Sequence, residues 1–314
     1  MNKKLKHFIK GLPLVKCFIF KFLHPHIKTK LISDKITHFF SDTDSSLHSF
    51  NQIPQIPKLI ISLTSFPARM DYIEYTIFSL ITQTIRSEKI ILWLTVSEFP
   101  NRENDLPAAL KRYEQFGLEI KFAGENHKSF NKLVFSLENY PDYIIVTADD
   151  DVYYAPAWLK TLYNTHIKNP KDIVSNRIRR VSFKKREIDS YNNWKHTVST
   201  SPSLLNFLLG YSGVLYPPHS LYKDVLDKSL FLSLSPHADD IWFYAMALLA
   251  GTKIRKPLKL FRTNFPFDYQ LEKEWESIPE LIKINLEENR NDTQLKAVLS
   301  HYSVFRDFYN KFSL

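Results

Sequence analysis

The sequence contains very little cysteine and glycine. Its 314 residues include one cysteine, Cys17, and six glycines. A single cysteine excludes an intramolecular disulfide and a metal site built from clustered cysteines, and it fits a reducing compartment. So few glycines exclude a fibrous or glycine-rich low-complexity chain. The apolar and aromatic contents, 44% and 14%, are those of a globular protein with a substantial core.

The sequence also contains no long uncharged apolar run. A helix that spans a membrane needs roughly 18–20 consecutive apolar residues. The apolar stretch 12–23 is interrupted by Lys16 and Lys21, and no small-residue cleavage site follows it, so a signal peptide is not expected.

Acidic residues are missing from residues 1–30, which contain eight lysines. Because these are eight of the 42 lysines and arginines, 34 remain against 33 acidic residues, and the rest of the chain is nearly neutral. A folded domain that binds nucleic acid would need a basic face, so this nearly neutral balance argues against one. The basic, aromatic-rich segment fits the surface of an anionic membrane. An ordinary helix that packs on the domain and exposes its lysines explains it equally well.

Apolar strands and helices alternate along the chain from residue 58. Strands are expected at 59–64, 89–94, 118–122 and 144–148, and helices at 73–81, 107–116 and 130–137. This alternation predicts an α/β fold with a mostly parallel, doubly wound sheet. Residues 41–57 have the composition of a linker. We therefore expect a basic N-terminal segment and linker at 1–50, the main domain at 51–265 and a C-terminal helical extension at 266–314.

Three consecutive acids, Asp149, Asp150 and Asp151, follow the apolar strand 144–148. Adjacent carboxylates repel one another, so they must be solvated, paired with cations or bound to a metal. They stand at the carboxyl end of a strand, where α/β sheets bind ligands, and oxygen ligands suit Mg²⁺ or Mn²⁺. The alternative is a solvated acidic turn before the next helix.

A second acidic pair, Asp239 and Asp240, opens the apolar helix expected at 241–249. Capping and the helix dipole favour acids at a helix N-terminus, but capping does not readily explain both. The basic and polar region 170–200 is expected to be a long excursion from the core, and its charges are typical of a solvated face.

These features together resemble the family 2-type bacterial glycosyltransferases, which have the GT-A fold. Residues 79–84 and 88–92 resemble the first helix and second strand of that family. The triple acid falls at its Asp-x-Asp motif, the turn 210–216 resembles its acceptor-side glycine loop, and Asp239–Asp240 stands where inverting members keep their base. The resemblance covers about residues 57–255. The second strand departs from the pattern, since it runs on to Thr95 and Glu98 without the aspartate that contacts the nucleotide base.

The resemblance implies a metal-dependent, inverting glycosyltransferase that uses a nucleotide sugar, with a UDP-sugar expected. Asp151 would bind Mn²⁺ or Mg²⁺, Asp149 the ribose or the metal through water, and Asp150 would matter less. Asp240 or Asp239 would be the general base. The nucleotide or its phosphates would contact four residues near strand ends, Thr64, Arg69, Lys128 and Lys132. For each of the three cations, the alternative is an ordinary surface charge without a role in binding. His301 is a weaker candidate as a metal ligand.

The expected acceptor is a growing cell-surface glycan, as in lipopolysaccharide or capsule synthesis, or another lipid-linked molecule. Residues 1–30 would then favour a cytoplasmic protein held at the inner face of the membrane. A nucleotidyl- or phosphotransferase is less favoured, because the loop 65–69 contains no glycine. The non-enzymatic alternative is an inactive GT-A-fold protein with a role at the membrane or in assembly.

Overall fold

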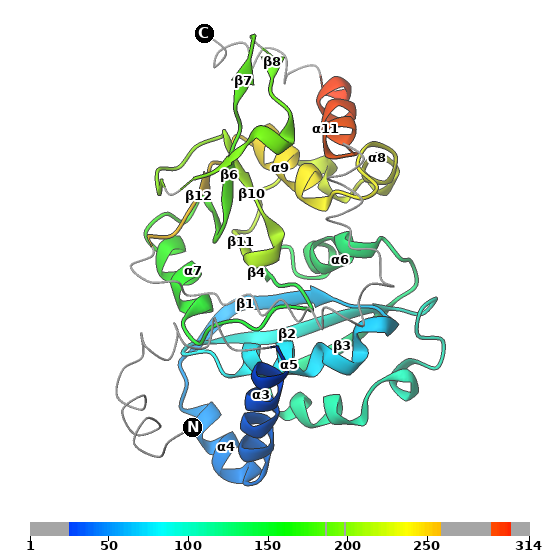
Figure 1. Ribbon diagram of the computed structural model, residues 1–314, viewed down its shortest axis with the longest axis vertical. Helices are drawn as coiled ribbons and strands as arrows, with labels where there is room; N and C mark the ends of the chain where they lie inside the picture. The colour runs from blue at the N-terminus through cyan, green and yellow to red at the C-terminus, as the bar shows by residue number, and fades with distance from the viewer. Residues whose placement is uncertain (1–24, 186, 198, 259–289, 303–314) are drawn as a thin grey trace.

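The computed structural model describes residues 25–185, 187–197, 199–258 and 290–302. Its centre is a seven-stranded sheet in the order β12-β5-β11-β4-β1-β2-β3 (Figure 1). The strands are β1 (Gln55–Thr64), β2 (Arg86–Thr95), β3 (Leu118–Ala123), β4 (Ile144–Thr147), β5 (Ile173–Ser175), β11 (Val214–Tyr216) and β12 (Ile254–Arg255). Strand β11 runs antiparallel to both of its neighbours, and the other pairings are parallel. The predicted mostly parallel α/β sheet is confirmed.

Helices cover both faces of this sheet. Consecutive residues of a strand point to opposite sides, so strands that are apolar throughout present apolar side chains on both faces. Leu59 and Ile61 of β1 pack on one face, and Ile60 packs on the other. The first face is covered by α3 (Pro25–Phe40), α4 (Thr43–Asn51), α5 (Met70–Ile81), the 3₁₀ helix η3 (Ala108–Phe116) and α7 (Trp158–His166). The second is covered by α6 (Asn131–Asn139), α8 (Lys228–Leu234), α9 (Asp239–Leu249) and α11 (Arg290–His301). Figure 1 shows α5 and α6 on opposite sides of the sheet, so it is doubly wound.

The linker expected at 41–57 is wrong over the range of α4 and at residues 55–57, where β1 already begins. Asp42 caps this helix by accepting a hydrogen bond from the Ser45 N–H at 3.0 Å. Phe50 is buried against Phe116, with ring centroids 5.3 Å apart. Its Ser- and Asp-rich sequence is therefore that of a capped helix. Residues 1–24, which hold most of the predicted basic segment, lie outside the described residues.

The region 170–200 is not the excursion from the core that its composition predicts. It contributes β6 (Ile178–Arg180) and β9 (Lys195–His196), which form a small sheet with β10 (Asn206–Leu208), and a hairpin of β7 (Phe183–Lys184) and β8 (Glu187–Ile188). Ile178, Trp194 and Phe207 are buried in the core. Charged residues dominate the composition, but the few apolar side chains face inward.

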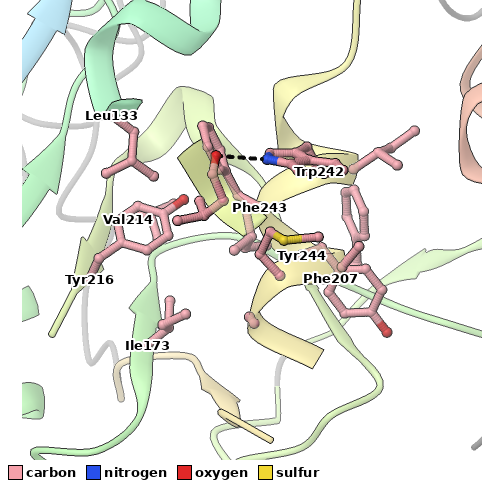
Figure 2. Packing of buried hydrophobic residues seen from close by; sticks show 14 of the residues in the cluster. Leu133, Ile173, Phe207, Val214, Tyr216, Trp242, Phe243 and Tyr244 are labelled. Carbon is pink, nitrogen blue, oxygen red and sulfur yellow. Dashed lines mark hydrogen bonds between the residues drawn. The ribbon is translucent and has the colours of Figure 1, made fainter. Parts of the chain in front are cut away.

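Helix α9 is surrounded by core on nearly all sides, and this fixes the position of its first residues. Trp242, Phe243 and Tyr244 pack among residues of β10, β11 and α6 (Figure 2). The Trp242 indole donates a hydrogen bond to the Val225 carbonyl at 3.1 Å. Within the described ranges, no helix is long and apolar enough to cross a membrane.

Candidate functional site

The two acidic motifs meet at one end of the sheet. Strand β4 ends at Thr147, and the triple acid follows directly. Because β11 runs antiparallel to β4, its first residue, Val214, pairs with Thr147. The turn before β11 therefore lies beside the end of β4, and its Gly210 contacts Asp240 at the start of α9.

Lys132 joins the two motifs. Its ammonium lies 2.8 Å from a carboxylate oxygen of Asp149 and 3.2 Å from one of Asp239. Burial alone would lower the pKa of Lys132, but the carboxylates of Asp149, Asp239 and Asp240 outweigh burial and raise the pKa well above its usual value. Lys132 is therefore a fixed cation. The expectation that it meets a donor phosphate stays a prediction, since its neighbours in the structure are acids.

Asp240 accepts hydrogen bonds from the backbone N–H of Gly210 at both carboxylate oxygens, at 3.1 and 3.0 Å. Burial and the neighbouring charge of Asp239 raise the pKa of Asp240 to about 8, against the pull of Lys132. A β-carbon on Gly210 would lie 2.8 Å from an Asp240 oxygen and 3.4 Å from the Lys132 nitrogen. A side chain at this position would therefore force Asp240 to shift.

The middle acid, Asp150, points away from this cluster and is buried. Its carboxylate accepts hydrogen bonds from Ser65 at 2.5 Å and from Arg69 at 2.6 Å, and its backbone carbonyl accepts one from Thr76 at 2.7 Å. These contacts tie the triple acid to the loop after β1 and to α5. Asp150 is thus held by groups of the protein, and the lesser role expected for it stays a prediction.

Asp151 forms an ion pair with the same arginine. An Arg69 nitrogen lies 2.6 Å from Asp151 and 2.6 Å from Asp150. Burial raises the pKa of Asp151 to about 7, although Arg69 lowers it. The two acids also act on the arginine, because their charges outweigh the effect of its burial and raise the pKa of Arg69.

The other predicted residues lie less centrally. Thr64 ends β1 and donates a hydrogen bond to the Trp93 carbonyl at 2.8 Å. Lys128 is exposed and is not among the ion pairs of the described residues. His301 is exposed at the end of α11, with its ring 4.7 Å from that of Tyr302. The contacts of the described residues do not link Lys128 or His301 to the acids, and their predicted roles stay predictions.

Two further residues hold the site. Gly210 was expected only as part of the turn 210–216 that resembles an acceptor-side loop, and Tyr154 was not predicted. The Gly210 N–H binds Asp240, and the Tyr154 hydroxyl accepts a hydrogen bond from the Asp149 N–H at 2.8 Å. Tyr154 is buried with its own N–H bonded to Ser79. The available signals were the glycine in an otherwise glycine-poor chain and a tyrosine close to three acids.

A surface pocket of about 460 Å³ lies at the carboxyl ends of β1 and β2. Its lining comes from the loop after β1, the start of α5 and the loop after β2, and comprises Pro67, Met70, Asp71, Glu98, Phe99, Pro100, Asp105 and Pro107. Two of its lining residues, Pro67 and Met70, flank Arg69 closely in the chain. Its size and its position at strand ends suit a small-molecule ligand.

The triple acid can hold a divalent ion only if a substrate completes the coordination. No group of three or more His, Cys, Asp or Glu side chains converges in the described part of the chain. The side chains of Asp149 and Asp151 are 24% and 31% exposed, whereas that of Asp150 is 8% exposed. Mg²⁺ is commonly bound by one or two carboxylates together with substrate phosphates. Asp149 and Asp151 fit such an ion, and the predicted metal site stays a prediction.

Comparison with known proteins does not assign a family. No family model matches the chain, and no curated protein matches it. Among solved structures, Staphylococcus aureus TarS 1–349 is 15% identical over 77% of this chain and 70% of its own, with a TM-score of 0.47. A mannosyltransferase from Pyrobaculum calidifontis in complex with GDP-Man and Mn²⁺ is 12% identical over 73% and 66%, with a TM-score of 0.41. A cytidylyltransferase from Leptospira borgpetersenii is 12% identical over 75% and 95%, with a TM-score of 0.40.

Proposed function

We propose that the chain is a GT-A-type glycosyltransferase, which moves a sugar from a nucleotide sugar to a hydroxyl group of a glycan acceptor. The observation that carries this proposal is the meeting of two acidic motifs at Lys132. Asp149 reaches this lysine from the end of a parallel strand, and Asp239 reaches it from the start of α9. One motif can serve the donor while the other activates the acceptor.

Asp240 is the proposed general base. A base works best when its pKa is near the working pH, and burial together with Asp239 raises the pKa of Asp240 to about 8. As the acceptor oxygen attacks the anomeric carbon, its proton passes to Asp240. The bond between that carbon and the nucleotide diphosphate breaks, and the diphosphate leaves with the bonding electrons. Attack from the side opposite the diphosphate inverts the anomeric carbon.

Asp239 has a different proposed role. Its carboxylate is 14% exposed and lies 3.2 Å from the Lys132 ammonium. The negative charge of Asp239 helps to raise the pKa of its neighbour Asp240. We assign Asp239 to tuning and positioning the base.

The donor would bind on the other side of Lys132. The nucleotide would lie in the pocket at the ends of β1 and β2, near Thr64, and its phosphates would face Arg69. When bound at Asp149 and Asp151, Mn²⁺ or Mg²⁺ would neutralise the charge of the leaving diphosphate. Asp150 would keep the loop in place through Ser65. We propose a UDP-sugar as the donor, on the sequence resemblance alone.

The nature of the acceptor and the cellular location are also proposals from the sequence. Residues 1–30 contain eight lysines and no acid, which favours contact with an anionic membrane. This supports a protein at the cytoplasmic face of the membrane that extends a lipid-linked glycan of the lipopolysaccharide or capsule type.

One observation favours the alternative, an inactive GT-A-fold protein of the membrane or of an assembly. Each acid of the triple motif is already held by a group of the protein, Asp149 by Lys132 and the other two by Arg69. A motif whose acids are already paired with cations of the protein could be stable without a ligand. The alternative predicts that no nucleotide sugar binds.

Binding of nucleotide sugars tests the proposal directly. A thermal-shift panel of UDP-, GDP- and CMP-sugars, each with and without Mn²⁺, would be run on the full chain. A ligand that binds only the native state adds about 2.7 kcal/mol of stability at a hundredfold excess over Kd. We expect stabilisation by one nucleotide class, and weaker stabilisation for Asp151→Asn. Lys111→Gln, an exposed change on η3, is the control. Stabilisation by none of the donors would favour the inactive protein.

A further inference from the structure

Basic side chains gather at the small sheet β10-β6-β9. Arg179 of β6 is paired directly with His196 of β9, so the two side chains lie on the same face of this sheet. The Lys256 ammonium donates a hydrogen bond to the carbonyl of Thr197, the next residue of that chain segment, at 2.6 Å. Arg177 precedes β6 by one residue. We call Arg177, Arg179, His196 and Lys256 the cationic cluster.

No carboxylate of the described residues forms an ion pair with any member of the cationic cluster, whereas the neighbouring Arg255 is paired with Asp172 at 2.8 Å. Two acids of the region, Asp189 and Asp292, accept hydrogen bonds from residues 190, 191 and 193 instead. Positive groups that are gathered without a counter-charge attract an anion.

The cluster members also act on each other's protonation. Burial lowers the pKa of His196, and the positive charges of Arg179, Arg177 and Lys256 lower it further. Burial and the charge of Arg177 lower the pKa of Lys256. An anion bound among these groups would remove this repulsion, so its binding stabilises the charged forms of both.

The cationic cluster adjoins the proposed base. The Arg177 guanidinium lies over the ring of Tyr211 at 4.9 Å, and Tyr211 directly follows Gly210, the residue that binds Asp240. The Arg177 carbonyl accepts a hydrogen bond from the Leu209 N–H at 3.1 Å. Arg177 is therefore attached to the loop that holds the base.

Arg179 makes two contacts with Tyr191. Its guanidinium lies over the ring of Tyr191 at 4.7 Å and donates a hydrogen bond to the Tyr191 carbonyl at 3.1 Å. The charges of both Asp240 and Arg179 act on the Tyr191 hydroxyl, the first raising its pKa and the second lowering it, after the larger effect of burial. Arg179 is therefore held against Tyr191 through both the ring and the backbone carbonyl of that residue.

We propose that the cationic cluster binds a phosphate group carried by the acceptor, close to the hydroxyl that receives the sugar. The guanidinium group of arginine can donate two parallel hydrogen bonds to two oxygens of one phosphate. Two of the four cluster members are arginines. The donor also carries phosphate, but its proposed place is at Arg69 and the triple acid. The phosphate binding itself is independent of the proposed function, whereas its assignment to the acceptor rests on that function.

Titration of the full chain with inorganic phosphate by calorimetry, at constant ionic strength and with and without saturating UDP, tests this proposal. The cluster variant is Arg177→Gln/Lys256→Gln, which keeps Arg179 and its bond to Tyr191. The matched control is Lys111→Gln/Lys160→Gln, which removes the same charge from two exposed positions on η3 and α7. Thermal melts confirm that each variant is folded, and Lys256→Gln alone serves if the double change prevents folding.

We expect the wild type and the control to bind phosphate both with and without UDP. The cluster variant should bind phosphate at least about tenfold more weakly. Equal phosphate binding by the cluster variant and the wild type, or none by the wild type, would overturn the site. Loss of phosphate binding when UDP is present would assign the phosphate to the donor and overturn the acceptor assignment. A failure of the proposed function appears separately, as absence of binding by every nucleotide sugar.

Discussion

The ammonium of Lys132 lies 3.2 Å from a carboxylate oxygen of Asp239, and this contact joins α6 to the start of α9. The same ammonium lies 2.8 Å from Asp149. Lys132 therefore compensates acids from two elements that are far apart in the sequence. Because this lysine is buried, the arrangement is stable only while all three charges are present.

Replacing Lys132 by Met should destabilise the protein. The change keeps most of the side-chain volume but leaves Asp149 and Asp239 without their shared cation. Breaking a buried ion pair by removing one partner costs roughly 3–5 kcal/mol, and urea denaturation would measure the loss. The matched control is Lys128→Met, four residues earlier and exposed, which should change stability by less than about 0.5 kcal/mol. Equal effects of the two changes would contradict the central position given to Lys132.

Replacing Asp240 by Asn should remove activity and preserve donor binding. Asparagine keeps the shape and can still accept a hydrogen bond from the Gly210 N–H, but it cannot take a proton. Loss of a general base costs about 10²–10⁴-fold in rate. The rate of sugar transfer and the Kd of the donor would be measured side by side. A variant that keeps the full rate would exclude Asp240 as the base, and Asp239→Asn would then be the next change to make.

The raised pKa of Asp240 also predicts how stability depends on pH. Its pKa is about 8 in the folded protein against 3.8 ordinarily, chiefly because of burial and Asp239. Between these values the folded state holds a proton that the unfolded chain has released. The contribution of Asp240 to the free energy of unfolding is thus fully present below about pH 4 and is lost as pH rises through about 8.

Urea denaturation of the wild type and of Asp240→Asn at pH 5, 7 and 9 checks this dependence. Asparagine does not ionise, so the stability of the variant relative to the wild type should increase as pH rises. Comparing the two proteins cancels the titration of groups far from this site. A constant difference across this range would mean that the pKa of Asp240 is not raised.

Much of the sheet could be predicted from the sequence, because its signals are local. The strand Ile144–Thr147 and its three acids are adjacent in the chain, so a buried strand that ends in carboxylates is readable directly. The acidic start of α9 is readable for the same reason. These local signals do not give the order of the strands, and the antiparallel insertion of β11 between β4 and β5 had no local signal either.

The connections within the site could not be predicted, because they depend on residues that the fold brings together. Lys132 and Lys128 have the same chemistry and flank the same helix start, and only the structure shows that Lys132 is buried among acids. The sequence also gives no sign that Asp150 and Asp151 form ion pairs with the same residue, Arg69. The burial of Trp194 in the core could not be predicted either, because the charged residues near it in the sequence are typical of a solvated loop.

Replacing Gly210 by Ala should impair the base while leaving the fold intact. The added β-carbon would lie 2.8 Å from an Asp240 oxygen, closer than real β-carbons approach such atoms, and 3.4 Å from the Lys132 nitrogen. Asp240 must then move away from the Gly210 N–H that holds it. We expect the rate of sugar transfer to fall by at least about tenfold, since small displacements of a reacting group are costly, with little change in donor affinity.

Gly124→Ala provides the control for this change. A β-carbon on Gly124 meets no other atom within 4 Å, so this substitution should leave both the rate and the donor affinity unaltered. Circular dichroism and thermal melts would establish that both variants fold, because a general loss of structure would also lower the rate. If the Gly210 variant transfers sugar as fast as the Gly124 variant, the contact between Gly210 and Asp240 does not position the base, and the acceptor must be activated elsewhere.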